Sequence, residues 1–99
     1  MASSTVHREF MLKIKLNIIN KLGLHARASA KFVALASRFA SEIEVQKGTH
    51  KVNGKSIMGV MMLAAAQGSE IELFIDGEDE HQLGAEMTTL IENRFGEAE

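Results

Sequence analysis

The sequence of 99 residues contains no cysteine, proline, tryptophan or tyrosine. Without cysteine, the chain cannot form disulfides, use a thiol in catalysis or build a zinc site on sulfur ligands. Histidine is the remaining classical ligand, and the four histidines stand at 7, 25, 50 and 81. None of them shares a ligand spacing such as H-x-x-x-H or H-E-x-x-H. We therefore expect no metal and no other cofactor.

Charge and hydropathy argue against two further classes of protein. The formal net charge is −2, and there is neither a basic stripe nor a set of aromatic stacking residues for a nucleic acid. No apolar run approaches the roughly 20 residues of a membrane span. The opening MASSTVHREF lacks the apolar stretch of a signal peptide. We expect a cytoplasmic protein without nucleic-acid binding or membrane insertion.

The size and composition predict one globular domain. Hydrophobic residues make up 45% of the chain, which is enough for one core in a chain of this length but not for two. The first periodic segment opens at Met11. Residues 11–99 are therefore predicted to form a single domain, and residues 1–10 a flexible extension or residues upstream of the natural start.

Hydrophobic periodicity predicts seven elements in the order β-α-β-β-α-β-α. Alternating apolar and polar residues indicate strands, and apolar residues three and four apart indicate helices. The predicted strands cover 12–18, 42–46, 50–52 and 70–76, and the predicted helices cover 26–39, 56–63 and 78–95. Alternating strands have one buried face, which the helices must cover. The fold class is therefore α+β, with two layers and an antiparallel sheet.

One helix start departs from local preferences. His25 stands at the N-cap of the helix from Ala26, although Ser, Thr, Asp and Asn cap best. Arg27 lies in the first turn, where the helix dipole disfavours a cation. An imidazole nitrogen is a nucleophile toward phosphorus, and helix N-terminal N–H groups bind phosphate. The pattern is compatible with phosphoryl transfer at His25 assisted by Arg27, but the spacing alone favours a loop histidine beside a surface arginine.

The short helix after Ser56 has no polar face. We expect Val60 and Leu63 to point into the core, which leaves Ile57, Met58 and Met61 as candidates for an exposed patch. Methionine is common on surfaces that meet several partners, but it also fills gaps in cores. Ser56 itself is a preferred N-cap residue.

Two segments carry a resemblance to a known family. GLHARAS, residues 23–29, and NGKSIMGVMMLAAAQG, residues 53–68, resemble the active-site segment and the second helix of the HPr family, the phosphocarriers of the bacterial phosphotransferase system. The resemblance extends from Met11 to about Phe95. It implies an open-faced β-sandwich, with a four-stranded antiparallel sheet covered on one face by three helices. The one departure is Ala28, where many members carry proline, a change expected to affect helix rigidity more than chemistry.

The resemblance also implies roles for single residues. His25 matches the histidine phosphorylated on Nδ1 by phosphorylated Enzyme I, with phosphoenolpyruvate as the original donor. Arg27 matches the arginine beside that phosphoryl group, and Ser56 the serine modified by a kinase/phosphorylase in some bacteria. The acceptors would be EIIA components of sugar permeases or regulatory EIIA proteins, docking on Ile57, Met58 and Met61. We expect a monomer.

Two other functions stay open at this point. One is a non-catalytic regulatory domain of ferredoxin-like α+β type that binds a small ligand at the Gly23 loop. The other is an interaction module that docks through its methionines. An enzyme acting on a small molecule is not expected, because the chain has no general-base pair and no deep-pocket motif.

Overall fold

The computed structural model describes residues 11–99, so His7 and the predicted extension at residues 1–10 lie outside it. Its elements follow the predicted order, with one added 3₁₀ turn near the end. They are β1 (Leu12–Asn17), α2 (Ala26–Ala36), β2 (Glu42–Lys47), β3 (His50–Asn53), α3 (Ile57–Met62), β4 (Glu70–Asp76), α4 (Glu80–Glu92) and η1 (Arg94–Gly96).

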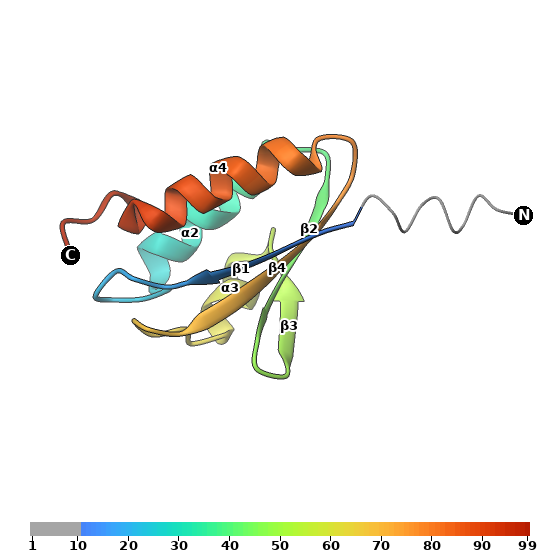
Figure 1. Cartoon of the computed structure of the whole chain (residues 1–99). Helices are drawn as coiled ribbons and strands as arrows, with labels where there is room; N and C mark the ends of the chain where they lie inside the picture. Colours follow the sequence, from blue (N-terminus) through green and yellow to red (C-terminus); the bar gives the residue numbers. More distant parts are fainter. Residues whose placement is uncertain (1–10) are drawn as a thin grey trace, which may run out of the picture.

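The four strands form one sheet in the order β1-β4-β2-β3. All three strand pairs are antiparallel, with Ile75 of β4 opposite Leu12 of β1 and Ile43 of β2. The helices form a second layer over the sheet (Figure 1), which confirms the α+β open-faced β-sandwich. β1 and β2, which α2 connects, both pair antiparallel with β4, so they run parallel to each other with β4 inserted between them.

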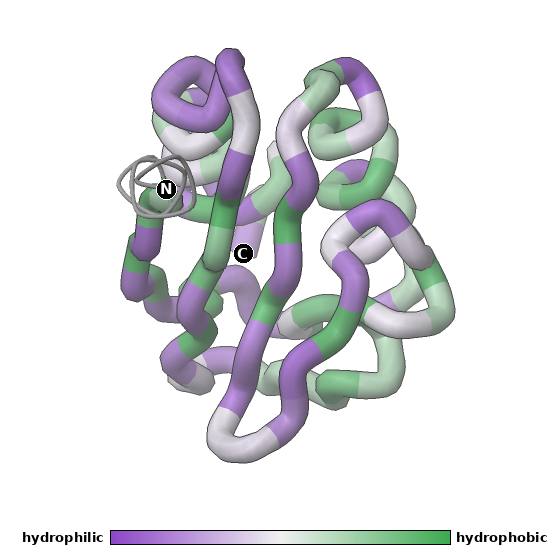
Figure 2. Tube along the Cα trace, turned by 90° about the vertical axis from the view of Figure 1, so that its right-hand side faces the viewer, coloured by the Kyte–Doolittle hydropathy of each residue, from purple (hydrophilic) through white to green (hydrophobic). Residues whose placement is uncertain are grey.

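Alternation along the strands separates the two faces of the sheet. In β4, Ile71, Leu73 and Ile75 are buried, whereas the residues between them point to the open face. Figure 2 shows this alternation as changes of colour along the strands. Phe74 is the aromatic residue on the open face, and the ammonium groups of Lys13 and Lys51 lie 5.9 and 4.0 Å from its ring centre. Such cation–π contacts cover a ring that would otherwise face water.

The buried face of the sheet packs against the helices in one core. Its large fully buried side chains include Phe32 of α2, Leu83 and Met87 of α4, and Phe95 of η1. No helix within residues 11–99 is long and apolar enough to cross a membrane.

The first helix is shorter than predicted. It ends at Ala36 and not at Phe39, because the N–H groups of Arg38 and Phe39 bond to the carbonyls of Leu35 and Ala36 in tighter turns. Phe39 nevertheless packs against the core. The prediction extended the helix to Phe39 because this partly buried apolar residue continues the helical spacing.

The last helix is also shorter than predicted. It ends at Glu92, three residues before Phe95, because the backbone leaves the helical conformation. Arg94 and Phe95 have φ values of 56 and 55°, in the left-handed region that costs a residue other than glycine on the order of 1 kcal/mol. Phe95 is nevertheless fully buried. The apolar spacing predicted its burial correctly and its backbone wrongly.

Asp79, which directly precedes α4, links the loop before α4 to the loop between α2 and β2, which lies far away in the sequence. It is one of three consecutive acidic residues, 78–80, and acidic residues at a helix start usually interact with the helix dipole. Its carboxylate instead accepts hydrogen bonds from the backbone N–H groups of Ala40 and Ser41, both at 2.9 Å, and from the Ser41 hydroxyl. The Ser41 hydroxyl bond, followed by the Ala40 N–H, holds the pKa of Asp79 below its ordinary value. The neighbouring Glu80 is buried and accepts from the Gly77 N–H at 3.0 Å.

Asp79→Asn is expected to lower the melting temperature at neutral pH, because an amide accepts these bonds less well than a carboxylate. The folded-state pKa is depressed, so the stabilisation is present above the ordinary carboxyl pKa of 3.8 and is lost as the pH falls through the lower folded value. The difference from the wild type should therefore narrow progressively as the pH falls below about 4. Thermal unfolding followed by circular dichroism from pH 7 to pH 2 measures it. Glu78→Gln, which removes a charge one residue earlier, is the control, and an equal loss in both variants would contradict the assignment.

Candidate functional site

His25 is the N-cap residue of α2. Its backbone is extended, with φ −72° and ψ −179°, and its Nδ1 accepts the backbone N–H of Arg27 at 3.3 Å. The imidazole thus occupies the place that a Ser or Asp side chain usually takes at a helix start. The cap directs Nδ1 toward the unpaired N–H groups of the first turn of α2.

The other ring nitrogen is bound by a residue that the sequence analysis did not consider. His25 Nε2 forms a hydrogen bond with the Oε2 carboxylate oxygen of Glu97, and the side chains are only 26% and 16% exposed. An ionised carboxylate only accepts hydrogen bonds, so Nε2 is the donor and carries a proton. Nδ1, which accepts from Arg27, then presents its lone pair at the surface. No pattern in the sequence connects two residues 72 positions apart.

Glu97 is ionised at neutral pH. Burial by itself would raise the pKa of this carboxyl, but hydrogen bonds from His25 and Asn20, together with the charges of Lys31 and of His25 when it is protonated, outweigh it. The pKa of Glu97 therefore lies below its ordinary value. A negative charge is held against one edge of the imidazole.

The loop from Asn20 to Leu24 holds the histidine in place. Asn20 is fully buried, and its Nδ2 donates to the Gly23 carbonyl at 2.9 Å and to Glu97 Oε1 at 3.0 Å. Gly23 has a φ of +65°, and a Cβ there would lie 2.4 Å from the carbonyl oxygen of Ala65. Leu24 donates its N–H to the same carbonyl at 2.9 Å. The segment after α3 therefore packs directly against the loop that presents His25.

The C-terminal segment crosses the site from the other side. Figure 1 shows it at the same end of the molecule as the loop between β1 and α2. Phe95 anchors it in the core, and Lys31 Nζ donates to the Phe95 carbonyl at 2.7 Å. Beyond Glu97, the Glu99 carbonyl accepts the Lys21 N–H at 2.9 Å, and the two side chains form an exposed ion pair at 3.3 Å.

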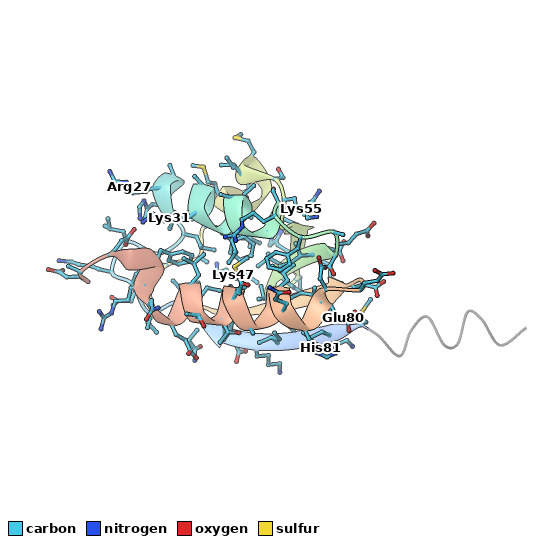
Figure 3. The ribbon with its side chains drawn as sticks, turned by 90° about the horizontal axis from the view of Figure 1, so that it is seen from above. Arg27, Lys31, Lys47, Lys55, Glu80 and His81 are labelled. Atoms are coloured by element: carbon cyan, nitrogen blue, oxygen red, sulfur yellow. The ribbon has the colours of Figure 1, made fainter. Side chains whose placement is uncertain are left out.

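Arg27 stands in the first turn of α2, exposed to solvent. Figure 3 shows its side chain at the end of α2, directed away from the ribbon. Within residues 11–99 its guanidinium has no hydrogen-bond or ion-pair partner. With His25, Leu22 and Glu97 it lines an open pocket of about 660 Å³. An exposed guanidinium without a protein partner is available to an anion.

The other described histidines are not part of this site. His50 is exposed at the start of β3, and His81 lies on α4, 3.8 Å from the carboxylate of Glu80. Figure 3 shows His81 at the opposite end of the molecule from Arg27.

The short helix α3 packs beside α2 and carries the apolar residues singled out from the sequence. Ile57, Met58 and Met61 are 43%, 68% and 37% exposed, whereas Val60 and Leu63 are buried, as expected. Met62 and Leu22 are exposed as well, at 76% and 67%, and were not singled out. Ser56 caps the helix through its hydroxyl, which accepts the Gly59 N–H at 3.1 Å.

Comparison with known proteins agrees with this geometry. The family model described as "PTS HPr component phosphorylation site" matches residues 12–93. The phosphocarrier protein HPr of Neisseria meningitidis serogroup A is 60% identical over 89 residues, which are 90% of this chain and all of that protein.

Solved structures give the same result. HPr-C-His from Thermoanaerobacter tengcongensis has a TM-score of 0.85 and 45% identity, covering 89% of this chain and 99% of that one. An HPr dimer from the same organism has a TM-score of 0.71 and 48% identity, covering 85% and 97%. Fold, site and sequence agree on a carrier of phosphoryl groups rather than a catalyst. The chain belongs to the HPr family of the phosphotransferase system.

Proposed function

We propose that His25 accepts a phosphoryl group from phosphorylated Enzyme I in the cytoplasm and passes it to an EIIA-type acceptor, in a sugar permease or in a regulatory protein. The observation that carries this proposal is the state of the imidazole. Nε2 is held by Glu97, and Nδ1 presents its lone pair at the start of α2. An unprotonated ring nitrogen is the form that attacks phosphorus, once its lone pair gives up the contact with the Arg27 N–H.

The surroundings of Nδ1 suit an anion that must stay only briefly. The first N–H groups of α2 can bind the phosphoryl oxygens once Nδ1 exchanges its contact with the Arg27 N–H for a bond to phosphorus. Helix dipoles contribute roughly 0.3–1 kcal/mol, and up to about 2 in partly buried sites. Contacts of this size orient the group without trapping it.

Arg27 is proposed to hold the phosphoryl group through charge-assisted hydrogen bonds from its guanidinium. Its exposure and its lack of a partner within residues 11–99 support this role. The resting protein loses little by keeping it free, because an exposed guanidinium stays hydrated.

Ile57, Met58 and Met61 are proposed to form the surface on which donor and acceptors dock. They are large, apolar and exposed, and α3 lies beside the helix that His25 caps. The loop after α3 touches the Gly23 turn. A partner seated on these residues would thus also reach the histidine.

Ser56 is proposed as a regulatory phosphorylation site for a serine kinase/phosphorylase. Its hydroxyl is half-buried and caps α3, so the cap alone accounts for a serine at this position. The proposal rests on the family segment and on the adjoining docking residues. That the protein acts as a monomer stays a prediction, since an HPr dimer is among the solved relatives.

The first test removes the nucleophile without removing the helix cap. His25→Asn should abolish labelling by phosphoenolpyruvate and Enzyme I, while asparagine, itself a good N-cap, keeps α2 intact. Mass spectrometry at mildly alkaline pH detects the acid-labile phosphate. His50→Asn and His81→Asn should label like the wild type. Comparable labelling of His25→Asn would refute the assignment.

A second test concerns docking. Changing both Met58 and Met61 to Lys should weaken the binding of Enzyme I at least tenfold, because charged groups would have to be desolvated against the partner. Stability should change little, since both side chains are exposed. Titration calorimetry measures the affinity. Met11→Lys, a substitution of an exposed methionine at the start of the described chain, is the control. Unchanged affinity would place the docking surface elsewhere.

A third test separates the two roles of Ser56. Ser56→Asp should reduce Enzyme I affinity, because a negative charge beside the docking residues must be desolvated, as a phosphate of about −1.5 to −2 charges would be. Ser56→Ala should transfer normally and lose about 1 kcal/mol of stability from the missing cap. Phosphoryl-transfer kinetics and chemical denaturation measure the two effects. Equal transfer rates in both variants would leave only the capping role.

A further inference from the structure

The hydrogen bonds of Glu97 extend from the reactive imidazole into the core. One carboxylate oxygen binds His25 Nε2 and the other accepts from Asn20 Nδ2 at 3.0 Å. Asn20 is fully buried, and the same Nδ2 also donates to the Gly23 carbonyl at 2.9 Å. Glu97 is thus held on the side away from the ring by a residue of the loop that precedes the histidine.

The backbone around Glu97 is held as firmly as its side chain. Two residues earlier Phe95 is buried in the core, and its carbonyl accepts from Lys31. The Glu97 N–H donates to the Arg94 carbonyl at 2.9 Å. The left-handed conformations of Arg94 and Phe95 turn the chain back toward α2 at a cost in backbone strain. Such strain is maintained where the surrounding contacts over-determine the conformation.

We propose that Asn20, Glu97 and His25 form a positioning chain that selects Nδ1 as the phosphorylated nitrogen. This inference rests on the proposed function of His25. Asn20 orients the carboxylate, and the carboxylate keeps the proton on Nε2. Nδ1 is then the ring nitrogen with an in-plane lone pair, and the cap holds it at the exposed start of α2. Glu97 touches neither phosphorus nor the donor, so it is a positioning residue and not a catalytic one.

The same carboxylate balances charge during transfer. As the Nδ1 lone pair forms a bond to phosphorus, the bond from phosphorus to the donor's leaving atom breaks and its electron pair stays with the donor. The ring keeps its Nε2 proton and gains positive charge. Glu97 lies against that proton and stabilises this charge, as the aspartate of a catalytic triad stabilises the imidazolium. Returning the group to an acceptor reverses the electron flow, and the proton never leaves Nε2.

The other charged groups around this chain cannot take the place of Glu97. Lys31 is engaged with the Phe95 carbonyl, and Lys21 with Glu99. Arg27 is exposed, on the Nδ1 side of the ring. Among these groups Glu99 is the other carboxylate, and its pairing with Lys21 makes it a matched control for Glu97.

The test reads the ring directly. Two-dimensional ¹⁵N–¹H correlation spectra of the resting protein should show His25 with the proton on Nε2 in the wild type. In Glu97→Ala they should show a mixture of the two tautomers. Transfer from Enzyme I should slow roughly ten- to a hundredfold, the cost typical of removing a partner that orients a functional histidine. Glu97→Gln, which retains an acceptor oxygen without the charge, should restore the Nε2 proton and recover only part of the rate.

The controls separate this inference from the proposed function. Glu99→Gln should leave both spectrum and rate as in the wild type, and an equal effect of the two glutamates would overturn the proposal. So would a Glu97→Ala variant with an unchanged tautomer, whatever its rate. Since the tautomer is read without phosphorylation, a wild type that took no phosphoryl group would refute the function of His25 and leave the positioning chain standing.

Discussion

The state of one imidazole ring is the constraint on which the rest of the site depends. His25 must cap α2 through Nδ1 and bind Glu97 through Nε2 at the same time, which leaves the ring almost no rotational freedom. Each contact draws in a different part of the chain. The cap needs the turn that Gly23 makes against the Ala65 carbonyl, and the carboxylate needs Phe95 in the core. Because the ring is held on both sides, its rotational entropy is already lost before the reaction. Aligning it with an incoming phosphoryl group therefore costs little more.

The two sides of the site differ in character. Around the histidine, short polar contacts and a buried asparagine set the geometry. Over α3, large flexible side chains lie exposed. Methionine adapts to different surfaces, so the proposed docking surface would accommodate unlike partners beside the fixed imidazole. The Leu24–Ala65 hydrogen bond joins the two regions.

Much of this fold was predictable from local patterns, because strand alternation and helix spacing are short-range signals. The exposed face of α3 was predictable for the same reason, since a helix without a polar face cannot be buried on every side of a two-layer protein. The predicted helix ends at Phe39 and Phe95 were wrong, because apolar spacing reports the burial of a side chain and not the conformation of its backbone. Sequence patterns could not predict the contact of Glu97 with His25, because the two residues are 72 positions apart. The contact depends on the left-handed backbone of Arg94 and Phe95, which turns the chain back toward His25.

The lysines over Phe74 have a consequence for the side of the sheet that carries no helices. An uncovered sheet with an aromatic ring at its centre invites stacking against another sheet, which is how β-rich surfaces associate. Here Lys13 of the neighbouring strand β1 and Lys51 of β3, two strands away on the other side, both reach the ring, so any second sheet would have to displace two hydrated ammonium groups before touching it. Two ammonium groups over the ring thereby make stacking on the open side of the sheet costly, which leaves the opposite layer, where His25 and α3 lie, as the side proposed for partner contacts.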